Sequence, residues 1–537
     1  MNMPSLTPES IRRVTAPVTR TQAPWHISPL PGRTRPLYAV HTNRRWAVGL
    51  ALLAVATFLI RARYLGDPFI DVDEQFYLLV GDRMLHGAVP YVDIWDRKPV
   101  GLFVLYAGIR MLGGEGIVQY QLVASAFAAA TAVTIALIAR RISSARAALV
   151  AGLVYIPALA MNGGAGGQTP VFYNLPMAIA GWILIDLAMR TSDHAEVRRR
   201  GLAAMLLVGI ALQIKYSALF EGIYFGLALL ALSWRAAPRR PAILIDAGLW
   251  IGAALLPTVL ALAYYAWIGQ AHAFLYANFL SIGARSADPL HETIRDLERV
   301  LVRMIPFAIA IIFGEWLLRD RGAPWLRRRG GRDGHRFAVG WLIASVFGFA
   351  VFGAFYRHYA LPLLVPLAVV SAPTYTIVHR HIGRAMAAMM LLAMFIAYPL
   401  DAAKNERRHG DAAYAREISD VISAHLHGRC PFIFYGPPIL YHTTNACLPS
   451  RWAFPFHLSL GREAGALGVD PATETNRILN NRPPVVVDRI ADDEDVNVAI
   501  QKLVRARLER DYRLIYAHAN GSREPDVDQV WLLKGES

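Results

Sequence analysis

Long apolar stretches separated by clusters of arginine are the feature that most constrains how this chain can fold. Between residues 46 and 400 they recur in blocks of about 15 to 25 residues, near the length that a helix needs to cross a bilayer. Hydrophobic residues make up 55% of the 537 residues and charged residues only 18%. So much apolar surface excludes a soluble enzyme and an intrinsically disordered chain. We therefore expect a polytopic α-helical membrane protein.

Eleven of these stretches are suited to cross the membrane. The predicted spans are residues 46–64, 117–139, 145–161, 170–189, 201–214, 217–234, 242–268, 300–318, 337–355, 359–378 and 385–400. A hairpin at Lys215 and Tyr216 divides the fifth span from the sixth. The segment 100–112 is also apolar, but it is too short to cross comfortably, so we expect it to lie in the interface.

The distribution of basic residues predicts the orientation of these spans. The formal net charge is +15, and in a membrane protein such an excess marks the loops that stay in the cytoplasm; it does not indicate a nucleic-acid partner. With eleven spans, the arginine-rich loops and the N-terminal segment fall on one side, while acids outnumber bases in the short loops opposite. The N-terminus is thus predicted to be cytoplasmic and the C-terminus to lie on the outer face.

The two ends of the chain differ from the apolar part. Residues 1–45 are rich in proline, threonine and arginine, and they predict a disordered cytoplasmic tail. From residue 401 to 537 the pattern is that of a small α/β domain on the outer face. Its strand-like runs are 431–435, 485–487 and 530–533, and a helical pattern covers 496–510.

The chain has only two cysteines, Cys430 and Cys447, and both fall in this outer-face domain. Two cysteines are too few for a multi-cysteine zinc or iron–sulfur site. In an oxidising compartment they form either a disulfide or a pair of buried thiols that pack as small hydrophobic groups. The sequence leaves both alternatives open.

The loop between the first two spans carries the strongest chemical pattern. Asp71, Asp73 and Glu74 stand within four residues, and such acids repel one another near a bilayer unless cations or a ligand compensate them. Arg97 and Lys98 follow just before the interfacial segment. Carboxylates and cations are thus both expected at the membrane surface, although a solvated acidic loop explains the charge pattern equally well.

Further polar residues fall on the same face. The hairpin 163–169 (GGAGGQT) is uncharged and flexible enough to approach a ligand closely. Lys215 occupies the outer hairpin, and Arg357 and His358 interrupt a long apolar run. Burying an unpaired cation there costs about 2.5–3.5 kcal/mol, so these positions favour a functional role. The competing interpretation is that the long side chains extend toward water or lipid headgroups.

The first-loop pattern resembles that of the GT-C superfamily of integral membrane glycosyltransferases. The resemblance rests on the acidic pair Asp73 and Glu74, on the Gly-x-x-Pro-Tyr-x-Asp stretch 87–93, and on Lys-Pro at the start of 98–100. It is strongest to the bacterial branch with the lipid A aminoarabinose transferase, protein O-mannosyltransferases and rhizobial lipopolysaccharide core transferases. Val100 replaces a second proline that is common in the family. The likeness covers residues 46–400, and family members have short juxtamembrane helices in this loop.

The resemblance implies transfer of a sugar from a polyprenyl-phosphate donor to a cell-envelope acceptor (lipopolysaccharide, another glycan or protein) at the outer face of the bacterial inner membrane. It implies a catalytic base at Asp73, with Glu74 as neighbour or alternative base, and inversion at the anomeric carbon. Some relatives use a divalent cation, which Asp71, Asp73 and Glu74 could hold. The cations expected to bind the donor phosphate are Lys98, Arg97, Lys215, Arg357 and His358.

A different class of function is a membrane transporter or a flippase for lipid-linked sugars, in which the outer charges form a substrate vestibule. Transporters usually show internal repeats and paired broken helices with polar groups near the midplane. The sequence has no convincing repeat, and its polar residues gather at one face. The transferase is therefore the favoured hypothesis.

Overall fold

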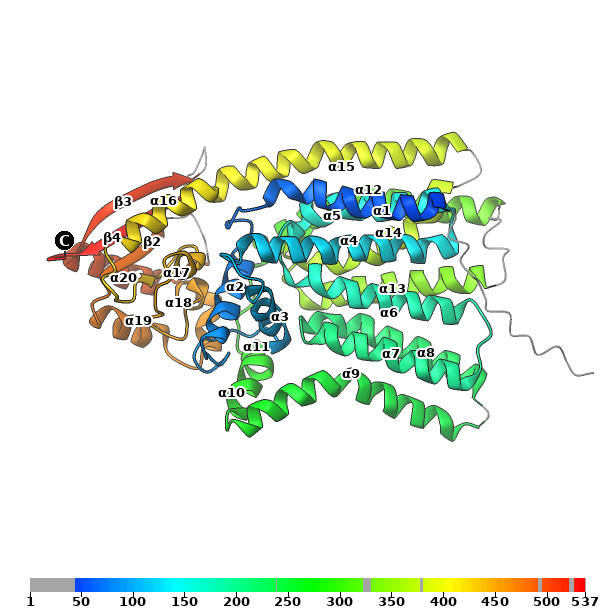
Figure 1. The fold of residues 1–537 in the computed structure, drawn as a ribbon, viewed down its shortest axis with the longest axis horizontal. Helices are drawn as coiled ribbons and strands as arrows, with labels where there is room; N and C mark the ends of the chain where they lie inside the picture. The colour runs from blue at the N-terminus through cyan, green and yellow to red at the C-terminus, as the bar shows by residue number, and fades with distance from the viewer. Residues whose placement is uncertain are drawn as a thin grey trace, which may run out of the picture. The chain divides into compact units, whose positions relative to one another are not determined.

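The computed structural model describes residues 44–237, 239–321, 330–376, 380–490, 495–520 and 526–536. Apart from Arg44 and Arg45, the predicted tail 1–45 lies outside the described residues. Long helices run side by side from residue 46 onward, and a smaller α/β part follows them along the chain (Figure 1).

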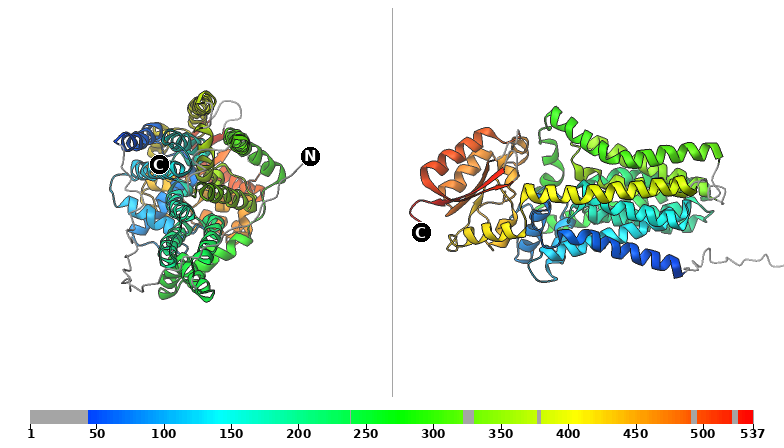
Figure 2. Two further views of the ribbon diagram at one scale, coloured as in Figure 1. Left: turned by 90° about the vertical axis from the view of Figure 1, so that its right-hand side faces the viewer. Right: turned by 90° about the horizontal axis from the view of Figure 1, so that it is seen from above.

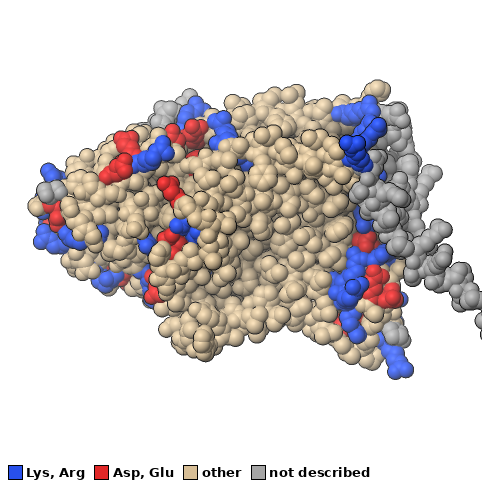
Figure 3. Space-filling model, in the orientation of Figure 1, with Lys and Arg blue, Asp and Glu red and all other residues tan. Residues whose placement is uncertain are grey.

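Eight helical stretches within the described residues are long and apolar enough to cross a membrane. They are α1 with η1 (Arg44–Tyr64), α4 (Ile117–Ile142), α5 with η2 (Ala145–Gly164), α6 (Thr169–Ala188), η3 with α8 (Tyr216–Ala236), α9 (Pro241–Trp267), α13 (Gly331–Phe352) and His381–Ser423, which contains most of α15 (Arg380–His409) and α16 (Ala412–Ser423). On the face shown in Figure 3, charged side chains gather at the two ends of the bundle and leave a broad band without charge between them. The protein is thus embedded in a membrane.

The other three predicted spans do not meet the same criteria among the described residues. One of them, 300–318, falls within a single helix, α12 (Leu290–Arg321), and another, 201–214, follows α7 (His194–Leu212) to its end and extends two residues beyond it. The third, 359–378, is helical as far as it is described, but its geometry changes from η5 (Arg357–Leu363) to α14 (Leu364–Ser371) and η6 (Ala372–Thr376), and residues 377 and 378 lie outside the described residues. Prolines at 362, 366 and 373 lack an amide hydrogen, which disfavours one regular α-helix over the whole segment. The total of eleven spans stays a prediction.

Short helices lie at the end of the bundle that faces the α/β part (Figure 1). In the loop between the first two predicted spans, which we call the first outer loop after its predicted side, they are α2 (Val72–Leu85) and α3 (Val100–Arg110), so most of the apolar segment 100–112 forms a helix too short to count as a span. The loop after α9 holds α10 (Ala271–Leu275), η4 (Tyr276–Leu280) and α11 (Ser281–Gly283).

The C-terminal part contains a four-stranded mixed sheet in the order β1-β2-β4-β3. Its strands are β1 (Phe432–Ile433), β2 (Val485–Ile490), β3 (Tyr512–Asn520) and β4 (Asp526–Leu533), with β1 parallel to β2 and the other pairs antiparallel. The helices of this part are α17 (Ile439–Thr443), α18 (Pro455–Ser459), η7 (Gly461–Ala466), α19 (Pro471–Asn480) and α20 (Val498–Asp511). The three predicted strands and the helix are confirmed, whereas β3 was missed.

Helix α15 runs without a break past residue 401, the predicted start of the outer-face domain, and ends at His409 (Figure 2). The first outer loop also joins the C-terminal part, since Trp95 is buried in a cluster with Phe434, Tyr435 and Trp452. The two parts are therefore packed together by residues from the loop that carries the acidic motif.

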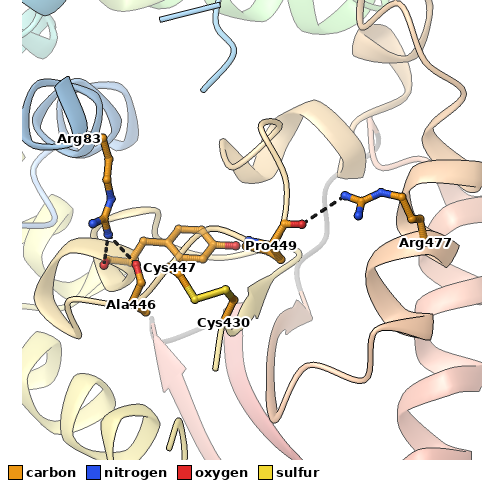
Figure 4. Close-up of a disulfide and its surroundings, with 7 residues drawn as sticks. Arg83, Cys430, Ala446, Cys447, Pro449 and Arg477 are labelled. Atoms are coloured by element: carbon orange, nitrogen blue, oxygen red, sulfur yellow. Dashed lines mark hydrogen bonds between the residues drawn. A yellow bond between two sulfur atoms is a disulfide. The ribbon is translucent and has the colours of Figure 1, made fainter. Parts of the chain in front are cut away.

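Cys430 and Cys447 form a disulfide, which decides between the two alternatives that the sequence left open (Figure 4). The bond closes a segment that contains α17. Arg83 of α2 donates a hydrogen bond to the carbonyl of Ala446, at 2.5 Å, and one to that of Tyr441, at 3.4 Å. The disulfide thus stiffens a segment that docks directly on the first outer loop.

Candidate active site

The acidic motif forms the first turn of α2. Asp71 is the N-cap, with an extended backbone (φ −154°, ψ 139°), and its carboxylate accepts a hydrogen bond of 3.0 Å from the Asp73 amide. Asp73 and Glu74 follow in the first turn, where the helix dipole favours negative charge. The repulsion expected among these three acids is thus partly offset, because they lie at the N-terminus of a helix.

Gln168 joins two of these acids. Its side-chain amide is buried and donates to Asp71 at 2.9 Å and to Asp73 at 3.0 Å. Its oxygen accepts from the Thr169 amide at 3.2 Å, which fixes which end of the amide faces the carboxylates. The sequence analysis identified the hairpin 163–169 but did not identify Gln168 as a site residue. Gln168 could have been recognised because it is the one side chain in that hairpin that can donate two hydrogen bonds.

Lys98 provides the positive charge beside Asp73. Its ammonium lies 3.9 Å from the Asp73 carboxylate and 5.4 Å from the centre of the Tyr77 ring. The loop that carries it is held by Tyr91, whose hydroxyl donates to the Lys98 carbonyl at 2.7 Å. Tyr91 belongs to the Gly-x-x-Pro-Tyr stretch and adopts a left-handed backbone (φ 71°). This stretch therefore positions the lysine.

The surroundings shift the pKa of Asp73 in the opposite direction from the pKa of Asp71 and Glu74. Burial by itself would raise the pKa of Asp73, but Lys98 and the Gln168 hydrogen bond lower it below its ordinary value. Burial and the neighbouring charge of Asp73 raise the pKa of Asp71. Burial, with the charge of Asp71, raises the pKa of Glu74 well above its ordinary value. Asp73 is therefore the acid of the three whose surroundings favour the ionised form, which is the form that a general base requires.

Glu74 points into the glycine-rich hairpin. Its carboxylate accepts a hydrogen bond from the Gly167 amide, and a Cβ added at Gly166 would overlap it. The hairpin is held from the other side by the buried Arg61, which donates to the carbonyls of Gly164 at 2.5 Å and Gly166 at 2.7 Å. Gly166 and Gly167 therefore leave space for the Glu74 side chain. The sequence had instead predicted a flexible loop that approaches a ligand.

Lys215 and His358 lie near the same carboxylate and cation. The Lys215 ammonium is 3.9 Å from the centre of the Tyr359 ring. Burial, with the like charge of Lys98, lowers the pKa of Lys215 to about 7, and Asp73 partly offsets this shift. Burial, with the charge of Lys215, lowers the pKa of His358 to about 3, so this imidazole is neutral at physiological pH.

Two of the predicted phosphate ligands make ion pairs elsewhere. Arg97 pairs with Glu463 of the C-terminal part at 2.5 Å and stacks 5.4 Å from the centre of the Trp95 ring. Arg357 lies 3.9 Å from Asp401 of α15. The structure thus brings Lys98, Lys215 and His358 toward Asp73, whereas Arg97 and Arg357 are engaged by other carboxylates.

The acidic motif does not form a three-carboxylate metal site. Within the part of the chain that the structure describes, no group of three histidine, cysteine or acidic side chains converges on one point. Asp71 and Asp73 share the Gln168 amide, while Glu74 faces Gly167. The residues present therefore do not fit the divalent cation that the family resemblance raised, and we derive no step through one.

The helical bundle, the two short helices α2 and α3 and the C-terminal α/β part together form a fold that is also found in solved membrane-protein structures. Two crystal structures of ArnT from Cupriavidus metallidurans share this arrangement. The one bound to undecaprenyl phosphate has 15% sequence identity and a TM-score of 0.58, and the match covers 91% of this chain and 98% of that one. The apo structure has 14% identity, a TM-score of 0.58 and the same coverage. Comparisons with protein-family profiles and with curated proteins find no match.

The resemblance stated from the first-loop motif is therefore confirmed at the level of the fold. The shared arrangement extends over almost the full length of ArnT and includes the part after residue 400, which the sequence motif did not cover. At this level of identity the likeness concerns the fold, and the roles of individual residues depend on the geometry of this chain.

Proposed function

We propose that the protein is a glycosyltransferase that transfers a sugar from a polyprenyl-phosphate carrier to a cell-envelope acceptor, with inversion at the anomeric carbon. The single observation that carries this proposal is the partly buried, ionised Asp73 beside Lys98. A base next to a fixed cation is what displacement of a sugar phosphate requires. The ArnT structure with undecaprenyl phosphate supports a lipid-phosphate donor on this fold.

In the proposed reaction an acceptor hydroxyl attacks the anomeric carbon of the donor sugar. Asp73 takes the hydroxyl proton while the new carbon–oxygen bond forms. The bond from the anomeric carbon to the phosphate oxygen breaks, and its electron pair leaves with the polyprenyl phosphate. Lys98 and Lys215 offset the charge that develops on that phosphate, because burial makes fixed charges more effective. One displacement of this kind inverts the anomeric configuration.

Asp73 is preferred to Glu74 as the base. Burial raises the pKa of Glu74, whereas the surroundings of Asp73 lower its pKa. The Glu74 carboxylate also accepts a hydrogen bond from the Gly167 amide, so Glu74 is assigned a structural role in holding the hairpin.

We further propose that the active site faces the periplasm of a bacterial inner membrane and that the N-terminus is cytoplasmic. The disulfide between Cys430 and Cys447 supports this orientation, because such bonds persist in oxidising compartments. The basic loops at the opposite ends of the spans support it independently. As part of the same proposal, the periplasmic domain begins near residue 401.

The test is sugar transfer by the Asp73→Asn variant, with Glu115→Gln as a control that removes an exposed acid from the same outer region. Asp73→Asn should abolish envelope-glycan modification, detected by mass spectrometry, while the amount of protein in the membrane stays unchanged. Lys98→Ala should raise KM for the donor. Full activity of Asp73→Asn would refute the assigned base. A flippase would move the lipid-linked sugar across vesicles without releasing polyprenyl phosphate, which separates the two classes of function.

A further inference from the structure

Two arginines from different parts of the chain converge on one carboxylate of α15. Arg303 of α12 lies 3.3 Å from Asp401, and Arg357 at the start of η5 lies 3.9 Å from the same oxygen. One negative charge thus faces two guanidinium groups, which leaves the cluster with a net positive charge.

Both guanidinium groups retain unused hydrogen-bonding capacity. Within the described residues, Nη1 of Arg303 is buried and has no hydrogen-bond partner. The Arg357 side chain is 43% exposed, and its contact with Asp401 at 3.9 Å is an ion pair longer than a hydrogen bond. Guanidinium groups present planar arrays of donors that match phosphate oxygens, so an anion between the two arginines would satisfy both.

The cluster lies where polar sequence meets apolar sequence on both helices. In α12 the segment before Arg303 is rich in charge, and the segment after it exposes Ile305 and Ile309. In α15 the exposed apolar residues Ile396 and Leu400 immediately precede Asp401. Such a boundary is where the phosphate of a membrane lipid lies, with its acyl chains against the apolar side chains.

This cluster borders the candidate donor site, since the Arg357 charge acts on Asp71 and His358, but its ion pair is with a different carboxylate. Arg357 and His358 are consecutive, yet Arg357 contacts Asp401, whereas His358 packs on Tyr359, the ring that also contacts Lys215. Segment η5 therefore presents one residue toward α15 and the next toward the Lys98 and Lys215 side.

We propose that Arg303 and Arg357 form a second anion site, distinct from the Lys98 site, that binds the phosphate of a membrane lipid. The lipid is either a phosphorylated substrate, such as an acceptor, or an ordinary phospholipid; the two share the phosphate that the arginines recognise. The proposal concerns binding and does not depend on glycosyl transfer, so it can fail or hold separately from the proposed function.

The test uses the full chain in neutral maltoside micelles, with Lys98→Met and Lys215→Met in every sample to remove the other phosphate site. Binding of dioleoyl phosphatidic acid is measured by native mass spectrometry, beside dioleoylglycerol and inorganic phosphate. Adding Arg303→Gln and Arg357→Gln together should weaken binding of phosphatidic acid about tenfold or more. Arg299→Gln is the matched control, since Arg299 is one turn away on α12 and pairs with Asp296.

A second variant gives an effect of opposite sign. Asp401→Asn removes the carboxylate that competes with the phosphate, so binding should become about two- to fivefold tighter. A variant that merely destabilised the fold would not gain affinity. Unchanged binding in the double arginine variant, weaker binding in Asp401→Asn, or equal binding of dioleoylglycerol or inorganic phosphate would overturn the proposal.

The source of the lipid is decided by comparing phosphatidic acid with phosphatidylglycerol. Tighter binding of the monoester supports a phosphorylated substrate, and equal binding of both supports an ordinary phospholipid.

Discussion

Replacing Gln168 with alanine should move the acidic limb of the pH profile for sugar transfer. The side-chain amide donates to Asp71 at 2.9 Å and to Asp73 at 3.0 Å. A hydrogen bond to a charged group contributes about 1.5–3 kcal/mol, and one pKa unit corresponds to about 1.4 kcal/mol. Losing the bond should therefore raise the pKa of Asp73 by about one to two units.

The sign of the effect follows from the role of Asp73 as a base. Its pKa lies below the ordinary value, so the ionised form is present above that pKa and is lost as the pH falls through it. A higher pKa in Gln168→Ala moves this loss to higher pH. At neutral pH Asp73 is still ionised, and we expect kcat to fall about tenfold because the carboxylate is no longer held in place.

The assay is release of polyprenyl phosphate from a lipid-linked sugar by membrane vesicles that contain the variant, followed from pH 2 to pH 8 so that the titration of Asp73, with a pKa of about 2, falls within the range. Thr169→Val is the matched control. Thr169 is the next residue in the chain, it is buried, and its hydroxyl has no hydrogen-bond partner among the described residues. It should leave the profile unchanged.

Two results would refute the reasoning. If Gln168→Ala lowered activity equally at every pH, the residue would support the fold without tuning Asp73. If the limb moved to lower pH, the Gln168 amide would not stabilise the ionised carboxylate.

Three further predictions follow from the same geometry. Lys215 has a pKa of about 7, so it loses its charge as the pH rises above 7. The value of kcat/KM for the donor should therefore fall about threefold or more from pH 7 to pH 9, and Lys215→Met should abolish this pH dependence. The cysteines lie 17 residues apart, so replacing Cys430 and Cys447 with serine should lower the free energy of unfolding of the C-terminal part by about 3 kcal/mol, measured by urea denaturation. Gly166→Ala should destabilise the protein by about 1–3 kcal/mol, seen as a lower Tm, because its Cβ would overlap the Glu74 carboxylate.

Each of these predictions has a control or a contradicting outcome. Lys502→Met removes an exposed lysine of the C-terminal part and should keep the wild-type pH profile. Gly108→Ala should leave Tm unchanged, since a Cβ there meets no atom within 4 Å. An unfolding free energy that is unchanged by the cysteine replacements would show that the disulfide does not restrain the unfolded chain.

Much of the fold was predictable because membrane spans follow from local composition. Inside a membrane, the backbone amide and carbonyl groups of an apolar segment can form hydrogen bonds only with one another, so the segment folds as a helix. The positions of such helices therefore follow from hydropathy alone. Local composition was less informative where the backbone geometry changes. Prolines divide the apolar segment 359–376 between 3₁₀ and α-helical geometry, and β3, which was missed, begins directly at the end of α20 without an intervening turn signal.

The sequence by itself determined the membrane class, the first-loop motif and the cysteine count, because each depends on residues close together in the chain. Only the tertiary structure decided which charges meet. Lys98 reaches Asp73, whereas its neighbour Arg97 turns to Glu463, more than 300 residues away. Gln168 joins Asp71 and Asp73 across almost 100 residues. Ion pairs and hydrogen bonds require atoms within a few ångströms, and a linear pattern does not specify such contacts between distant segments.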